Sequence, residues 1–257
     1  MKILVTNDDG VFSEGINTLA RELKKSAEVT VVAPDRERSA VGHSVTFFNP
    51  LRIQKIKEEK NITVYSSDGT PSDCVLLGIY AVMDKKPDVI VSGINRGANM
   101  GFDLTYSGTV SAAMEGTIQK IPSIAISLAS FEDLYFDYAA KIARKIAKII
   151  YENGLPEGTF LNVNVPNVSE EKIKGVELTK QGKSIYDQKL LKRADPRGIE
   201  YYWLTGAYPY GEPIPGTDFA EVHNKKVSIT PVHLYMTNEN AFEFSLIKHI
   251  ENNLNKK

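Results

Sequence analysis

The first 33 residues carry a strand, a helix and a second strand in direct succession, and this order constrains the fold most. Residues 3–5 are an unbroken apolar run, which is typical of a strand covered on both faces. Residues 28–33 are predicted as the second strand. Between them, apolar residues recur at helical spacing after the potential N-cap Ser13, at Ile16, Leu19, Ala20 and Leu23. The pattern predicts parallel strands joined by a right-handed crossover.

Strand and helix patterns continue to about residue 175. Strands are predicted at 45–48, 51–56, 62–66, 88–92, 123–127 and 160–165, with the charged residues 57–60 as an exposed turn. Helices with one apolar face are predicted from Pro71, from Tyr106 and over 137–153. We therefore expect an α/β fold, a three-layer Rossmann-like domain with a mainly parallel central sheet. The core would span about residues 1–175, completed by a strand at 227–233.

The last third of the chain changes character. Residues 186–193 and 199–205 flank Asp195-Pro-Arg-Gly198, whose residue types suit a type I turn, so we predict a hairpin arm over about 183–206. Tyr201, Tyr202 and Trp203 crowd one of its strands, and an arm that projects from a domain cannot bury them alone. We favour a subunit contact. Thr237 is predicted to cap a C-terminal helix over about 238–254, and residues 1–257 form one domain.

Composition excludes several classes of protein. The 257 residues are 42% hydrophobic and 25% charged, as in ordinary globular proteins, and the net charge is −1. No global basic field therefore indicates duplex nucleic acid or an anionic membrane as a partner. The single cysteine, Cys74, excludes an intramolecular disulfide framework and a multi-cysteine zinc site, and we expect it to be buried. Without a membrane-length apolar run or a signal-peptide pattern, a cytoplasmic location is expected.

Polar loops follow several of the predicted strands at their carboxyl ends, where ligands bind in open α/β sheets. Asn7-Asp8-Asp9-Gly10 follows the first strand, and its adjacent carboxylates indicate a solvated turn or a metal site with similar weight. Residues 35–44, 93–99 and 106–109 are the other candidates. Their oxygen-rich composition suits Mg²⁺ or Mn²⁺ rather than zinc. The predicted helix start at Ser107 and Thr109 is a potential anion site, although Ser107 can also serve as an N-cap.

Three familiar motifs are absent. The glycine-rich stretch 93–101 lacks the lysine and hydroxyl ending of a P-loop and the glycine spacing of a dinucleotide fingerprint. Phosphatases of the haloacid-dehalogenase type carry an Asp-x-Asp-Gly loop after their first strand. Here Asn7 would occupy the position of the aspartyl nucleophile. Direct attack by water is therefore preferred to a phospho-aspartate route.

Five spaced blocks resemble the survival-protein SurE family and cover residues 1 to about 127. They are Asn7-Asp-Asp-Gly10, Ala33-Pro-Asp35 with Arg38-Ser39 and Gly42-His-Ser44, Gly69-Thr-Pro71 with Asp73-Cys-Val75, Ser92-Gly-Ile-Asn95 with Gly97, Asn99 and Gly101, and Tyr106-Ser-Gly-Thr-Val110 with Glu115-Gly116. Later matches are thinner, namely Leu161-Asn-Val-Asn-Val-Pro166, Thr217-Asp218 and Val227-Ser-Ile-Thr-Pro231.

The resemblance implies a metal-dependent phosphomonoesterase acting on nucleoside 5′- and 3′-monophosphates by a metal-activated water, that is, a 5′-nucleotidase. It implies one divalent ion per subunit, Mg²⁺ or Mn²⁺, held by Asp8, Asp9, Ser39 and Asn95, with Asp8 and Asp9 also catalytic. It implies phosphate contacts from Asn99, Ser107, Gly108 and Thr109. It also implies a homodimer or homotetramer that exchanges C-terminal segments.

The chain departs from the family pattern at two places. Ala40 stands where many members have glycine, and His223-Asn-Lys-Lys226 replaces a more usual glycine-containing turn. His43 is left outside the catalytic set, because a structural hydrogen bond is the more ordinary role for an isolated histidine. The alternatives to an enzyme of this type are a non-catalytic nucleotide-binding stress or survival protein and a metal-dependent transferase.

Overall fold

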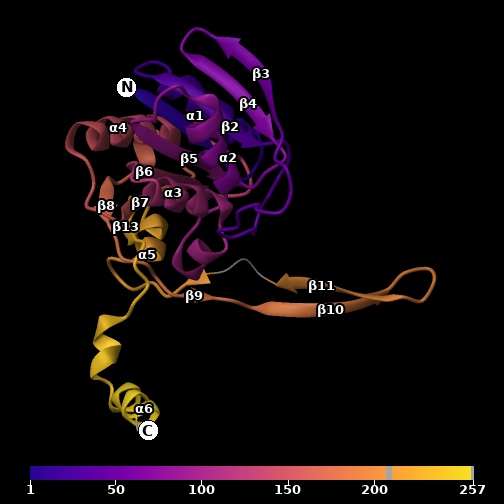
Figure 1. Ribbon diagram of the computed structural model, residues 1–257, viewed down its shortest axis with the longest axis vertical. Helices are drawn as coiled ribbons and strands as arrows, with labels where there is room; N and C mark the ends of the chain where they lie inside the picture. Colours follow the sequence, from indigo (N-terminus) through magenta and orange to yellow (C-terminus); the bar gives the residue numbers. More distant parts are fainter. Residues whose placement is uncertain (207–209, 256–257) are drawn as a thin grey trace.

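The computed structural model describes residues 1–206 and 210–255 (Figure 1). In chain order its elements are β1 (Lys2–Thr6), α1 (Glu14–Leu23), β2 (Glu28–Pro34), β3 (Ile53–Glu59), β4 (Ile62–Ser67), α2 (Pro71–Leu77), the π-helical turn η1 (Gly78–Val82), β5 (Val89–Arg96), the 3₁₀ helix η2 (Gly101–Thr105), α3 (Gly108–Ile118), β6 (Ser123–Ala129), α4 (Phe136–Asn153), β7 (Thr159–Pro166), the 3₁₀ helix η3 (Glu170–Lys172), β8 (Val176–Leu178), β9 (Ser184–Ile185), β10 (Gln188–Ala194), β11 (Glu200–Gly206), β12 (Tyr210–Gly211), α5 (Asp218–His223), β13 (Val227–His233), the 3₁₀ helix η4 (Glu239–Glu243) and α6 (Ser245–Leu254).

A mostly parallel sheet forms the middle layer, as predicted. Among the described residues it has nine strands in the order β3-β4-β2-β1-β5-β6-β7-β13-β8. Only β3 with β4 and β7 with β13 pair antiparallel within it. Helices α1 and α4 pack on one face and α2 and α3 on the other, so the expected three-layer α/β architecture is confirmed (Figure 1). No described helix is long and apolar enough to span a membrane.

Apolar cores lie on both faces of the sheet because each strand presents side chains to both faces. Ile3 and Val5 of β1 join the core beneath α1 and α4, whereas Leu4 joins the core beneath α2 and α3. All three side chains are fully buried, as the unbroken apolar run predicts. Cys74 is also fully buried, which confirms its predicted packing role, and burial raises the pKa of its thiol.

Strand β1 lies where the strand order reverses. It pairs with β2 on one side and with β5 on the other, both in parallel. The chain therefore builds outward in one direction through β2 and in the other through β5. The loops that follow β1 and β5 diverge above this point, which is where open α/β sheets bind ligands.

The structure corrects the prediction for residues 45–60. Residues 45–48 contain no strand, and the strand expected at 51–56 is β3, which extends to Glu59 and takes in most of the expected turn. The charged run misled the prediction because β3 is an exposed edge strand, where lysine and glutamate side chains are tolerated and discourage unwanted pairing. The reversal falls one step later, at Asn61, which has φ 63°.

The structure differs from the prediction at β5, at α5 and in the C-terminal helix. Strand β5 continues to Arg96, into the stretch expected to be a loop. Helix α5 was not predicted, because its six residues are too few to show periodicity. The expected C-terminal helix is divided into η4 and α6, and Asn238 rather than Thr237 precedes η4.

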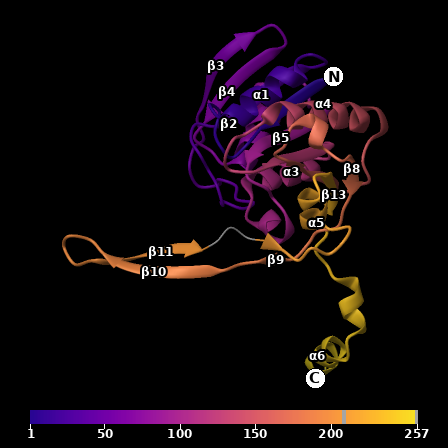
Figure 2. The ribbon, with the colours of Figure 1, turned by 180° about the vertical axis from the view of Figure 1, so that it is seen from behind.

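The hairpin arm projects away from the core (Figures 1 and 2). Strands β10 and β11 pair antiparallel, with Leu191 opposite Trp203. The Gly198 N–H donates to the Asp195 carbonyl at 2.9 Å, which closes the predicted turn. Trp203 is 62% exposed and its neighbour Leu204 is 68% exposed, so the chain alone leaves the arm's apolar side chains uncovered.

Candidate metal and phosphate site

The Asp8 carboxylate is held from behind by the start of helix α3. The Thr109 hydroxyl donates to Asp8 Oδ1 at 2.6 Å, and the Thr109 backbone N–H donates to Oδ2 at 3.1 Å. Asp8 is only 4% exposed. A carboxylate that receives hydrogen bonds at a helix N-terminus also interacts favourably with the helix dipole, so α3 fixes the orientation of Asp8 and favours its ionised form.

Two glycines allow this close arrangement. Gly10 has φ +95°, so it turns the chain sharply after the two aspartates, as the sequence suggests. Gly108 brings the α3 backbone against Asp8, since a Cβ there would lie 2.8 Å from the Asp8 Cβ. The buried Asn7 closes the loop from inside, because its side-chain nitrogen donates to the Gly10 carbonyl at 3.0 Å and to Ser13 Oγ at 2.8 Å.

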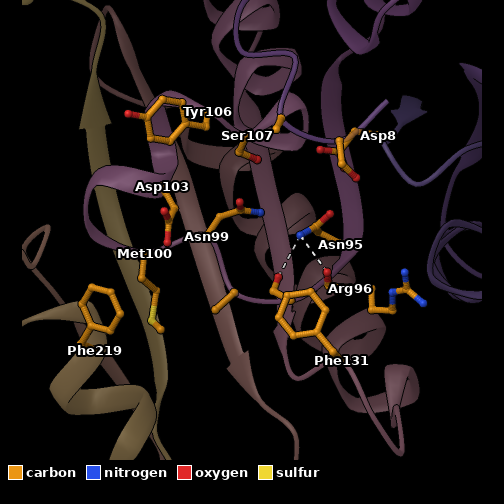
Figure 3. Close-up of a pocket in the computed structure, with 14 residues that line it drawn as sticks. Asp8, Asn95, Arg96, Asn99, Met100, Asp103, Tyr106, Ser107, Phe131 and Phe219 are labelled. Atoms are coloured by element: carbon orange, nitrogen blue, oxygen red, sulfur yellow. Dashed lines mark hydrogen bonds between the residues drawn. The ribbon is translucent and has the colours of Figure 1, made fainter. Parts of the chain in front are cut away.

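A bulge at the end of β5 presents the next oxygen. The register between β5 and β6 shifts between Ser92 and Asn95, as expected where a bulge re-aims a side chain. The Asn95 side-chain nitrogen donates to the carbonyls of Gly97 at 2.9 Å and Arg96 at 3.3 Å. Its oxygen consequently points toward the Asp8 carboxylate in Figure 3. The Arg96 backbone N–H donates to Asp9 Oδ2 at 3.0 Å, which ties the β1 loop to β5.

Five of the predicted site residues line one cavity of about 290 Å³, namely Asp8, Ser39, Asn95, Asn99 and Ser107. Asp9 lines an adjoining hollow of about 310 Å³, and Arg96 lines both. Gly108 and Thr109 are buried, and Thr109 is engaged with Asp8. The structure thus brings the predicted residues to one edge of the sheet, while direct phosphate contacts from Gly108 and Thr109 stay a prediction.

The two serines in the cavity are held differently. Ser39 is exposed, and its hydroxyl donates to Glu37 Oε1 at 2.7 Å, which leaves the lone pairs of its oxygen available. Ser107 is the N-cap of α3, as predicted, because its Oγ accepts from the Val110 N–H at 3.1 Å.

Asn99 is fixed from β7. Its carbonyl accepts from the side-chain nitrogens of Asn162 and Asn164, both at 2.9 Å, and its own side-chain nitrogen donates to Ser127 Oγ at 2.8 Å. Asn162 and Asn164 were not predicted as supports of the site. Their signal was present in the sequence, because two buried asparagines on one face of an apolar strand require partners.

Burial and mutual repulsion make the aspartate pair unfavourable without a cation. Burial raises the pKa of Asp8, although the Thr109 hydrogen bonds oppose the shift. Burial, followed by the nearby Asp8 charge, raises the pKa of Asp9 to about 6. Both effects would be relieved by positive charge placed against the two carboxylates.

The donor set is suited to a hard divalent cation. It consists of oxygens only, from two carboxylates, one amide and one hydroxyl, which is the ligand chemistry of Mg²⁺ and Mn²⁺. Within residues 1–206 and 210–255, no group of three or more His, Cys, Asp or Glu side chains could hold a metal. A cation here would therefore depend on the two aspartates, neutral oxygens and water, as Mg²⁺ commonly does.

Other cavity-lining residues were not among the individually predicted site residues, although Arg96 and Tyr106 lie in the predicted candidate loops. Arg96, Asp103, Tyr106, Phe131 and Phe219 all line the cavity. Phe131 follows β6 at the same sheet edge, so the carboxyl-end rule could have found it. Phe219 lies on the unpredicted α5, and nothing local in the sequence marks it. His43, which was left outside the set, contacts Glu115 Oε2 through Nε2 at 2.9 Å.

Comparison with known proteins agrees with this geometry. The family model for survival protein SurE matches residues 3–188. This chain belongs to the SurE family. The 5′-nucleotidase SurE of Pelobacter propionicus is 50% identical over 239 residues, covering 93% of this chain and 95% of the relative. That of Thermosipho africanus is 48% identical over 239 residues, covering 93% of this chain and 94% of the relative.

A solved structure of the SurE family has the same fold. The crystal structure of the SurE protein from Aquifex aeolicus superposes with a TM-score of 0.83 at 46% identity. The match covers 98% of this chain and 100% of that one. The likeness therefore includes the C-terminal third as well as the α/β core.

Both departures from the SurE pattern fall at strained backbone. Ala40 has φ 56°, and Lys225, just after helix α5, has φ 64°. Both lie in the left-handed region, which glycine adopts at no steric cost. Glycine would therefore suit either position, whereas alanine and lysine adopt this conformation at a steric cost.

Proposed function

We propose that this chain is a metal-dependent phosphomonoesterase, a 5′-nucleotidase that hydrolyses nucleoside 5′- and 3′-monophosphates to nucleoside and phosphate. The carrying observation is the buried Asp8 carboxylate, held by Thr109 at the start of α3 and faced by the Asn95 oxygen at the sheet's switch point. Membership of the SurE family, and relatives that bear the name 5′-nucleotidase SurE, support the proposal.

One divalent ion, Mg²⁺ or Mn²⁺, would be held by Asp8, Asp9, Ser39 and Asn95. The raised pKa of each aspartate supports this assignment, since a cation would offset the cost of two adjacent buried charges. When bound, the ion supplies positive charge that polarises the phosphoryl group and favours attack by water.

The chain's own residues would bind and orient the phosphate. The Asn99 amide and Ser107 hydroxyl line the cavity beside the N-terminus of the eleven-residue helix α3. Such an arrangement offers hydrogen bonds and a favourable dipole to an anion. Thr109, already bonded to Asp8, would act chiefly by keeping that carboxylate in place. Asn7 is buried and bonded within its loop, which supports attack by water over a covalent route.

The exposed arm supports assembly as a homodimer or homotetramer with exchanged C-terminal segments. Its aromatic and aliphatic side chains remain uncovered in one chain, which is unfavourable unless a second surface covers them. We further propose that residues 1–257 act as one α/β unit in the cytoplasm, with neither duplex nucleic acid nor membrane as a partner.

Turnover by an Asp9→Asn variant tests the metal site. The substitution keeps the side-chain shape and removes one charge, so activity on a nucleoside monophosphate with Mn²⁺ should be abolished while the far-ultraviolet circular dichroism is unchanged. Asp84→Asn, at an exposed turn, is the matched control and should remain active. Full activity of Asp9→Asn in the presence of EDTA would overturn the metal mechanism.

The same assay separates the enzyme from a non-catalytic nucleotide-binding protein. Nucleotide binding by the wild-type chain without phosphate release, across Mg²⁺, Mn²⁺ and several nucleoside monophosphates, would favour the binding protein. Release of inorganic phosphate that EDTA stops would support the nucleotidase.

A further inference from the structure

Asp103 is a second acidic group in the cavity, apart from the aspartate pair. It lies on η2, between Asn99 and Ser107 in the sequence, and lines the same cavity as both. In the view of Figure 3, Asn99 lies between Asp103 and Asp8. The proposed phosphate residues therefore separate Asp103 from the proposed cation ligands.

The Asp103 side chain is held from one side only. Tyr186, just before β10, donates its hydroxyl to Asp103 Oδ1 at 2.7 Å. In the described part of the chain, Oδ2 accepts no hydrogen bond, and neither lysine nor arginine pairs with this carboxylate. Burial raises the pKa of Asp103, while the Tyr186 bond acts against the shift. The backbone is also fixed, since the Tyr106 and Ser107 N–H groups both donate to the Asp103 carbonyl at 3.1 Å.

Asp103 lies in a cavity that is proposed to bind a phosphate, so its carboxylate needs a partner other than that phosphate. Like charges repel, and the effect is stronger where water is partly excluded, so Asp103 is unsuited to contact the phosphate itself. Its open oxygen can instead accept from a neutral hydroxyl, and charge-assisted hydrogen bonds of this kind are stronger than neutral ones. In a nucleotide, the neutral hydroxyls nearest the phosphate belong to the sugar.

Apolar side chains line much of the hollow next to this cavity. Met100, Phe131 and Phe219 line both the first cavity and a neighbouring hollow of about 560 Å³, which Tyr210 and Pro213 also line. Flat apolar walls of this kind suit a heterocyclic base. The cavity with the phosphate residues and the hydroxyl acceptor therefore adjoins an apolar hollow.

We propose that Asp103 accepts a hydrogen bond from a ribose hydroxyl and so selects, among nucleoside 5′-monophosphates, those that carry the sugar diol, an inference that rests on the proposed nucleotidase function. Asp103 is then a specificity residue, and Tyr186 is the residue that positions it.

Paired substrates test this contact. The wild-type protein should prefer adenosine 5′-monophosphate to its 2′,3′-dideoxy analogue by roughly 10- to 100-fold in kcat/KM, the value of one hydrogen bond to a charged group. Asp103→Ala should bring the ratio close to one, mainly by raising KM for the ribonucleotide. Asp103→Asn, which keeps the shape but not the charge, should give an intermediate ratio, as should Tyr186→Phe.

Other outcomes would overturn the proposal. An unchanged ratio in Asp103→Ala excludes the sugar contact. An equal fall in kcat on both nucleotides would instead assign Asp103 to proton transfer to the leaving oxygen. Thermal melting of each variant shows whether it is folded, and the ratio is measured within one protein preparation, so a loss of active fraction does not alter it.

Calorimetric binding of the two nucleotides in EDTA separates this inference from the proposed function. If the wild-type protein binds both but hydrolyses neither with any metal, the nucleotidase assignment fails. A binding preference for the ribonucleotide that Asp103→Ala removes would still support the sugar contact. Equal affinities for both nucleotides in the wild-type protein would contradict it.

Discussion

Side chains around the cavity and on the hairpin arm lie in opposite environments. Around the cavity, polar groups are buried and held by distant parts of the same chain, as with Asp8 and Thr109, which are 101 residues apart. On the arm, apolar groups are exposed and touch little beyond the partner strand of the hairpin, as with Leu191 opposite Trp203. A single chain therefore holds the site residues in place, whereas the exposed apolar side chains of the arm favour contact with a further surface.

Removing the Asp8 charge should have the largest effect, a loss of activity at the site. Asp8→Asn keeps the shape but weakens the cation site and the bond from Thr109, so kcat/KM with Mn²⁺ should fall by roughly 100- to 1,000-fold. Steady-state kinetics on a nucleoside monophosphate measure it. Because a buried charge disappears, thermal melting without metal should not show a lower midpoint. Near-normal kcat/KM would contradict the role given to Asp8.

A change on the hairpin arm should affect subunit association and not the fold of the core. Trp203→Ser removes a largely exposed apolar group, so the core should lose little stability while subunit association weakens. Light scattering coupled to size-exclusion chromatography should report a smaller mass at micromolar concentration. Tyr151→Ser, an exposed aromatic on α4, is the control and should leave the mass unchanged. If Trp203→Ser also leaves the mass unchanged, the arm is not the interface.

The charge state of Asp9 should make the stability of the folded protein depend on pH. Its pKa in the folded protein is about 6, above the ordinary 3.8, so the folded state binds more protons than the unfolded state between these values. The ionised Asp9 therefore destabilises the folded protein. This effect is complete above pH 6, decreases as the pH falls, and is absent below about 3.8. Without metal, wild-type stability relative to Asp9→Asn should therefore rise from pH 8 to pH 5. Urea unfolding at several pH values measures the difference.

Added Mn²⁺ should invert the same trend. A cation interacts with the ionised pair, so the increase in melting temperature on adding Mn²⁺ should be larger at pH 8 than at pH 5. A stabilisation by Mn²⁺ that does not change with pH, or that persists in Asp9→Asn, would contradict this account of the pair.

The smallest effect concerns the backbone after α5. Lys225→Gly relieves a left-handed conformation and should raise the free energy of unfolding by about 1 kcal/mol. Lys24→Gly is a matched control, because Lys24 ends α1 with φ −62° and glycine there should destabilise the protein. Chemical denaturation of both variants gives the comparison. If both substitutions lower the free energy of unfolding, the φ of the replaced residue does not decide whether glycine stabilises the protein.

Local sequence predicted the sheet core and the main loops of the site. Unbroken apolar runs identify β1 and β5, because strands covered on both faces cannot carry polar alternation, and the carboxyl-end rule then brings the loop with Asp8 close to Asn95. The direction of the Asn95 side chain was not predictable, since it depends on a register shift between β5 and β6. Phe219 was also beyond reach, because only tertiary packing brings α5 to the cavity.

The position of β13 has a consequence for synthesis on the ribosome. This last strand lies between β7 and β8, although residues 227–233 emerge long after both. A nascent chain that stops before residue 227 therefore carries β7 with an unpaired edge, and an open edge invites pairing with other chains. The sheet can close only after residues 227–233 have left the exit tunnel, so β7 and β8 wait for a strand that is synthesised after both.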